Sequence, residues 1–436
     1  MNKRLLTLII SFSLCGSASA ENLLDIYQQA QEKDPQLLEA KAQRDAAFEK
    51  INEAQAANLP QINLSADLGY QKTNQDDYKT AGNAGATLGL TQSLYRRSNW
   101  INSDITEKLA TQSDVNYNYE KQSLIVNTAN AYFSVLSAKD ALEYANANLE
   151  ALKRQLDETQ QRYTVGMTAI TDVDEAKAAY DLASADVIVA ENNLANSYEG
   201  LRQLTGTEHK QLDLLDTDRF SPVALTDTSD NWMKLAQDNN LQLHQQRIAK
   251  DIAKQQIDLA QTGHEPTLDL GANLGSEYTD YKNSGAGYDD GTLNTGSIGF
   301  KFNLPLYSGG AVDSRVKQAQ FNYVSASEAL EKNYRSIQAD LYRSYNDVNG
   351  AIGSVRAYQQ SVISAQSALT ATRAGYEVGT RTVVDLLDAT TKLYSAKQQL
   401  SSARYGYILK LLQLKQVAGN LQEQDLIDVN NGLRKG

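Results

Sequence analysis

Apolar residues recur every seven positions along four segments of this 436-residue chain. The position three residues after each of them usually holds alanine. The four series are Val135, Leu142, Leu149, Leu156 and Tyr163; Val173, Tyr180, Val187, Leu194 and Leu201; Val348, Val355, Val362, Leu369 and Tyr376; and Leu386, Leu393, Leu400, Tyr407 and Leu414. Heptads of this kind are typical of coiled-coil seams, and alanine lets helices approach closely. The pattern predicts two long helical hairpins.

Proline and glycine limit these hairpins. No proline occurs from 61 to 221 or from 306 onward, so 98–163 and 309–376 have room for single helices of about 66 residues, near 100 Å. Each hairpin turns where a glycine suits the left-handed conformation that closes a helix. The predicted tips are Val165, Gly166 and Met167 in the first hairpin, and Val378, Gly379 and Thr380 in the second.

Four shorter segments, 59–71, 84–95, 265–278 and 293–307, alternate apolar with polar or small residues, which predicts strands. Each has about 10–12 alternating residues, enough to cross a bilayer at a tilt. Two soluble hairpins are the alternative. Four strands cannot close a barrel, and open edges do not occur in lipid, so membrane strands must be completed by other copies. Three copies would supply twelve strands, but two would also reach the minimum.

The N-terminus has the features of an export signal over residues 1–20. Lys3 and Arg4 precede an apolar run, and small residues through Ala20 allow cleavage before Glu21. The only cysteine lies within this leader. A mature protein without disulfides has to be stabilised by packing or oligomerisation.

The rest of the chain is one unit used twice. Residues 22–70 align with 228–276 without a gap, placing Pro60 on Pro266. This predicts a first repeat at 21–206, a linker at 207–227, a second repeat at 228–419 and a C-terminal segment at 420–436. A period above 200 residues is too long for a solenoid and indicates an internal twofold repeat.

Composition and charge exclude several classes. Hydrophobic residues make up 41% of the chain, and no long apolar run follows the leader, which rules out a polytopic helical membrane protein. An excess of acids, 53 against 41 bases, disfavours nucleic acid as a partner. His209, His244 and His264 lack metal-ligand spacing, and no glycine-rich phosphate loop occurs. We therefore expect neither an enzyme nor a cofactor. The heptads alone permit a periplasmic coiled-coil adaptor or structural protein.

One segment carries a family resemblance. Residues 375–390, Gly-Tyr-Glu-Val-Gly-Thr-Arg-Thr-Val-Val-Asp-Leu-Leu-Asp-Ala-Thr, and the repeated unit resemble the TolC-like outer-membrane factor family over nearly the whole mature chain. The resemblance implies an α+β homotrimer, with a 12-stranded barrel in the Gram-negative outer membrane and a periplasmic helical tunnel. It also implies a periplasmic adaptor and an inner-membrane pump of the resistance-nodulation-division, ABC or major facilitator type. Drugs, bile salts or protein toxins would be the cargo.

Asp385 and Asp388 are the clearest candidate site residues. They lie three residues apart on one helix face. Thr382 with Asp385 has capping-box spacing, so a structural role is expected. The resemblance adds a second, compatible role as a gate and selectivity ring at the periplasmic entrance. In a trimer, six carboxylates would raise one another's pKa values.

The resemblance also implies gating links and a docking surface. Arg381 and Tyr376 match gating residues whose partners correspond to Asp172 and Thr171, while the tip glycines match adaptor-docking positions. The fork of Arg381 suits a charge-assisted link to Asp172, although an inconsequential surface ion pair is the alternative. Asp174 and Glu175 depart from the family pattern. They either make the mouth more acidic or, for Asp174, cap a helix from Thr171.

Overall fold

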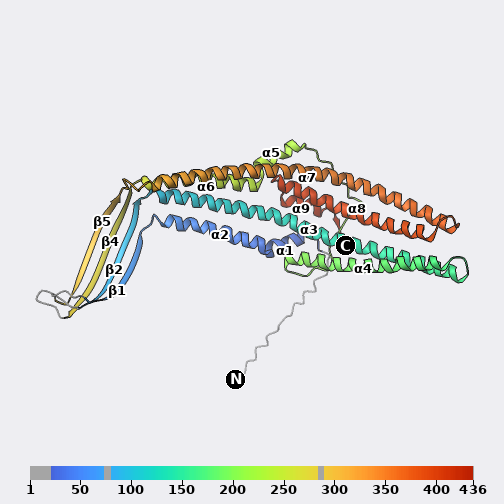
Figure 1. The fold of residues 1–436 in the computed structure, drawn as a ribbon, viewed down its shortest axis with the longest axis horizontal. Coiled ribbons are helices and arrows are strands. Elements are labelled where there is room, and N and C mark those ends of the chain that lie inside the picture. The colour runs from blue at the N-terminus through green and yellow to red at the C-terminus, as the bar shows by residue number, and fades with distance from the viewer. Residues whose placement is uncertain (1–20, 73–79, 283–288, 436) are drawn as a thin grey trace, which may run out of the picture. The chain divides into compact units, whose positions relative to one another are not determined.

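The computed structural model describes residues 21–72, 80–282 and 289–435, so the predicted leader lies outside the described residues. Contacts divide the chain into two compact units. Figure 1 labels the helices and strands that they contain. The helical unit contains the chain up to Leu38, Tyr119–Asn240 and Ile337 onward, and the sheet unit contains Glu39–Asn118 and Leu241–Ser336. Each unit is described by itself below.

Two helices run through both units. They are α3, Arg97–Thr164 with 68 residues, and α7, Ala311–Glu377 with 67 residues. Their bounds lie within two residues of the proline-free segments predicted from the sequence. A stretch free of proline and centred on good helix formers has nothing to interrupt its hydrogen-bond ladder.

The sheet unit holds a four-stranded antiparallel sheet in the order β1-β2-β4-β5. Its strands are β1 (Gln61–Lys72), β2 (Thr80–Tyr95), β4 (Thr267–Lys282) and β5 (Gly291–Asn303), and its helices are α2 (Pro35–Ala56), α6 (Leu241–Gln261) and the 3-10 turn Thr262–His264. Strands β2, β4 and β5 extend farther toward the hairpin loops than the alternation predicted. The ladder continues through Gly and Asn because it needs only backbone groups. By contrast, β5 ends four residues early, before Pro305, which lacks an N–H.

The two faces of this sheet differ in chemistry. Ile62, Leu90, Ala272 and Ile298 stand in register across the four strands, and the next row consists of Asn63, Gly89, Asn273 and Ser297. Neighbouring rows point to opposite faces. Ile298 is 78% exposed within the single chain. One apolar and one polar face are therefore built into the register.

The helical unit contains two helical hairpins. The first joins α3 to α4 (Ile170–Thr205), and the second joins α7 to α8 (Val383–Val417). Several predicted heptad positions are buried along them, including Val135, Val348, Leu201 and Leu414, whereas Tyr163 at the end of its series is 44% exposed. Near the tips, α4 packs against α8, and the buried cluster there consists of Leu152, Ala176, Ala183, Val383 and Leu387. The alanines permit this close packing of the two hairpins.

The rest of the helical unit forms from segments that carry neither heptads nor alternating apolar residues. It comprises α1 (Leu23–Lys33), α5 (Ser229–Asn239), α9 (Glu423–Asn430) and the paired strands β3 (Leu214–Leu215) and β6 (Leu433–Arg434). The segment 207–227, expected only as a linker, therefore pairs with the C-terminal segment. None of the helices in the described part of the chain is long and apolar enough to cross a membrane.

Candidate gate at the hairpin tips

The first tip is closed by a left-handed glycine. Gly166 has φ +73°, its N–H donates to the Tyr163 carbonyl at 2.9 Å, and Met167 N–H donates to the Arg162 carbonyl at 2.8 Å. This pattern satisfies the last carbonyls of α3. The flanking Val165 and Met167 are 69% and 74% exposed. The tip thus presents apolar side chains to its surroundings.

The second tip is built in a similar way. Gly379 has φ +78° and donates to the Tyr376 carbonyl at 3.1 Å. The N–H groups of Thr380 and Arg381 both donate to the Gly375 carbonyl. A Cβ on Gly375 would lie 2.7 Å from Arg381 Cγ, so the missing side chain leaves the space through which Arg381 passes.

Asp385 caps the helix that follows. Thr382 Oγ1 accepts from Asp385 N–H at 3.1 Å, and Asp385 Oδ2 accepts from Thr382 N–H at 3.0 Å. The predicted capping box is therefore confirmed. Hydrogen bonds from Thr382, and secondarily the charge of Arg381, hold the pKa of Asp385 below its usual range.

Asp388 has a different neighbour. Lys392 Nζ lies 2.6 Å from Asp388 Oδ2, one helical turn away, and both side chains are exposed. Lys392 is not among the residues predicted for the site, although its i,i+4 spacing from an acid is a sequence signal for such a pair. Asp385 in the first turn of α8 and Asp388 in the second therefore each meet a cationic or donor group from their own chain.

The residues expected on the first hairpin are placed differently from the prediction in one respect. The N-cap of α4 is Ala169, so Thr171 lies inside the helix, and the idea that Asp174 caps it from Thr171 is wrong. The Asp172 carboxylate instead accepts from the Thr168 hydroxyl. Within the described part of the chain Asp172 forms no ion pair with Arg381, and this link stays a prediction.

Tyr376 connects the hairpins through a contact that sequence reasoning missed. The Arg162 guanidinium lies 4.7 Å from the centre of the Tyr376 ring, and Arg162 also pairs with Glu158 at 2.8 Å. The ring packs against the buried cluster between the hairpins. A guanidinium over an aromatic ring is attractive, by about 0.5–1 kcal/mol at exposed sites. Tyr376 therefore holds the second hairpin to the first within a single chain.

Comparison with known proteins identifies the family to which this architecture belongs. A family model for outer membrane efflux proteins matches residues 26–207 and 232–420. The chain belongs to the outer membrane efflux protein family. It is 47% identical to the outer membrane protein TolC of Escherichia coli over 99% of this chain and 90% of that protein. This efflux protein is therefore an outer-membrane protein of a Gram-negative bacterium.

Two further comparisons concern secretion and fold. The efflux protein is 30% identical to the proteases secretion protein PrtF of Dickeya chrysanthemi, over 98% of this chain and 94% of that one. The crystal structure of CusC aligns with a TM-score of 0.79 at 16% identity, covering 92% of each chain. The latter shows a shared fold alone. The relation to PrtF agrees with an exit duct and disfavours the alternative that this chain is itself a periplasmic coiled-coil adaptor.

Proposed function

We propose that this efflux protein is a homotrimeric exit duct for tripartite efflux pumps and type I secretion. Four strands from each copy would close a 12-stranded barrel in the outer membrane, and the helical hairpins would continue it as a periplasmic tunnel. The chain would contribute an internal twofold repeat to each third of the ring.

The observation that carries this proposal is the two-faced sheet with open edges. Strands β1 and β5 each pair on one side only within the sheet. The apolar row through Ile62 and Ile298 suits lipid, and the polar row through Asn63 and Ser297 suits a water-filled lumen. Because unpaired edges are costly in lipid, pairing of β1 with β5 of another copy satisfies both.

The periplasmic end would be gated by the hairpin tips. Asp385 and Asp388 of three copies would form the carboxylate ring that attracts cations. Arg381 and Tyr376, with Asp172 and Thr171 as their partners, would hold the closed state. Contacts each worth about 1 kcal/mol or less, repeated around a threefold ring, give a gate that a partner's binding energy can open.

The tips would also bind the adaptor. Val165, Met167 and Val378 are among the more exposed apolar residues of the helical unit, and exposed apolar groups mark interaction sites. Gly166 and Gly379 fix the two turns, and Thr380 follows Gly379 in the second tip. An inner-membrane pump of the resistance-nodulation-division, ABC or major facilitator type would supply drugs, bile salts or protein toxins as cargo.

A complementation experiment tests the duct function. Expression in a Gram-negative strain lacking its own exit duct should restore bile-salt resistance, with the protein recovered as a trimer from the outer-membrane fraction. A matched control carries Gly379→Pro, which cannot adopt the positive φ at the tip and should give trimer without resistance. Recovery of wild-type protein only as a monomer in the soluble periplasm would overturn the proposal.

A further inference from the structure

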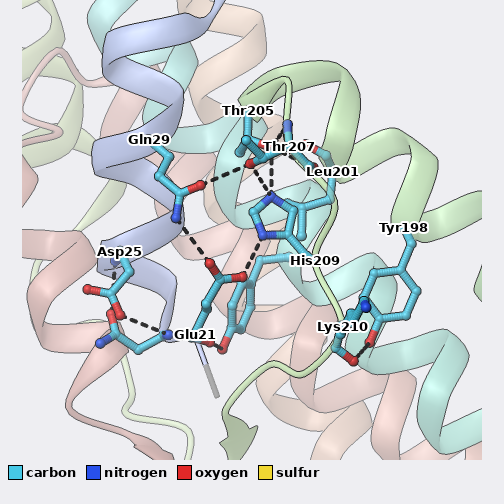
Figure 2. A network of polar contacts seen from close by, with 11 residues as sticks. Glu21, Asp25, Gln29, Tyr198, Leu201, Thr205, Thr207, His209 and Lys210 are labelled. Atoms are coloured by element: carbon cyan, nitrogen blue, oxygen red, sulfur yellow. Dashed lines mark hydrogen bonds and ion pairs between the residues drawn. The ribbon is translucent and has the colours of Figure 1, made fainter. Parts of the chain in front are cut away.

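The helical unit contains a polar site built around Glu21, the first residue after the predicted leader (Figure 2). The Glu21 backbone nitrogen donates to the Gln211 carbonyl at 3.0 Å, and its carbonyl accepts from Asp213 N–H at 3.0 Å. The Tyr132 hydroxyl, on a fully buried side chain, lies 3.3 Å from the same carbonyl. Glu21 thus pairs like a short strand with the segment 211–213.

The Glu21 side chain is held as firmly as its backbone. Oε2 lies 2.5 Å from His209 Nδ1, and Oε1 accepts from Gln29 Nε2 at 3.1 Å. The His209 side chain is 0% exposed, and its Nε2 lies 2.6 Å from Thr205 Oγ1. Figure 2 shows these groups converging on Glu21 from α1, from the end of α4 and from the segment after it. So many partners would be unusual for a residue that leader removal places at a chain end, because chain ends are commonly poorly ordered.

The surroundings of the Glu21 backbone are acidic. Burial raises the pKa of the Tyr132 phenol, and the charges of Asp213, Asp25 and Glu21 raise it further. Because the Tyr132 hydroxyl lies 3.3 Å from the Glu21 carbonyl, the negative charges of these three carboxylates also reach the Glu21 backbone. A positive charge there would interact favourably with each of them.

We propose that this site receives the α-ammonium group that leader removal creates on Glu21. Hydrolysis of the Ala20–Glu21 peptide bond consumes one water, leaving a carboxylate on Ala20 and an amine on Glu21 that is mostly protonated at neutral pH. The ammonium donates to the Gln211 carbonyl where an amide would otherwise donate, and charge-assisted bonds are the stronger ones. Leader removal at this bond therefore completes the fold of the helical unit and links export to stability.

Hydrogen exchange on the full-length protein tests the proposal. A Gly-Thr pair inserted between Ala20 and Glu21 keeps every side chain of the site but leaves the Glu21 nitrogen as an amide. In this variant the Asp213 amide, which donates to the Glu21 carbonyl, should exchange about tenfold faster. Intact mass establishes the first residue of each protein. The same insertion between Gly16 and Ser17 is the matched control and should leave exchange unchanged.

Two results of this experiment would overturn the proposal. One is equal exchange of the Asp213 amide in the extended and native proteins. The other is an intact mass that places the native N-terminus anywhere but Glu21. A further variant, Glu21→Gln, keeps the ammonium and loses the carboxylate, so it should retain part of the protection. A loss as large as that from the extension would mean that the side chain alone holds this segment, against the proposal.

Discussion

Asp385 and Asp388 show how one residue type acquires two roles within a single helical turn. Asp385 is engaged by the Thr382 backbone and hydroxyl, while Asp388 reaches outward to Lys392. The cap fixes the direction of the first carboxylate, and the ion pair partly neutralises the second. In the proposed carboxylate ring, the strength of cation binding would therefore depend on Lys392 as well as on the acids.

Cation block of the channel tests this dependence. In planar bilayers, Asp385→Ala combined with Asp388→Ala should abolish block by multivalent cations added from the periplasmic side. Lys392→Gln should strengthen block, by up to about fivefold, because an exposed ion pair contributes at most about 1 kcal/mol. Lys410→Gln, on the same helix but far from the tip, is the control. Block that persists in the double alanine variant would remove the carboxylates from the mechanism.

The capping box of α8 should respond to acid. The pKa of Asp385 is lowered in the folded protein, so its contribution to stability is complete above the unfolded value of about 3.9 and is lost as the pH falls through the lower folded value. The first turn of α8 should therefore fray in acid, below about pH 4. Helical chemical shifts or exchange of the amides near Val384 would report the change. In Asp385→Asn this pH dependence should be absent.

At the scale of elements, two glycines that end equivalent helices offer a matched pair. Gly206 follows α4 with φ +66°, and Gly419 follows α8 with φ +75°. A Cβ on Gly206 would meet nothing within 4 Å, whereas one on Gly419 would lie 2.4 Å from the Asn239 backbone. Gly206→Ala should cost about 1–2 kcal/mol from backbone strain alone. Gly419→Ala should cost clearly more in thermal unfolding, since α5 must move away, and equal losses would contradict this packing.

If the contact between the hairpins helps to hold the proposed gate closed, variants that weaken it should raise conductance in proportion to the contacts they remove. Arg381→Ser combined with Tyr376→Phe should raise single-channel conductance. Arg162→Gln should raise it alone to a smaller extent, because it removes the cation over the Tyr376 ring at 4.7 Å. Arg154→Gln, whose partner Glu150 lies on the same exposed helix face, is the control. Unchanged conductance in the double variant would exclude the latch, and an unchanged Arg162 variant would exclude its cation–π part.

Element by element, periodicity predicted what repeats and missed what occurs once. Helices α3 and α7 were predicted closely because proline is absent along their whole length and a heptad seam, such as Val348 to Leu369 in α7, extends over several turns. The pairing of Leu215 with Leu433 was missed, since two-residue strands carry no period and join segments more than 200 residues apart. At the site, the Thr382–Asp385 cap could be predicted because its two residues lie only three positions apart in the sequence. The Arg162–Tyr376 contact was not, because it depends on how two helices pack.

At the scale of the whole molecule, low hydrophobicity follows from the way apolar groups are used. Coiled-coil seams need apolar residues only at two positions in seven, and strands with one wet face need them at every second position. A chain with 41% hydrophobic residues can therefore form very long helices and a membrane sheet. The number of copies is not encoded in such periods. In the proposed barrel it would depend on strand tilt and stagger at the interface between copies.

The faces of the sheet provide the sharpest test of the assembled molecule. Ile298 and Ser297 are neighbours on β5 but belong to opposite faces of the register. Ile298→Arg should prevent insertion or destabilise the trimer, because an arginine facing lipid costs about 2–4 kcal/mol near the bilayer midplane. Ser297→Arg should leave the trimer intact and alter ion selectivity from the lumen. Both are scored by outer-membrane fractionation, trimer yield and reversal potential in bilayers. If the two arginines have the same effect, or if Ser297→Arg alone blocks assembly, the face assigned to lipid is the wrong one.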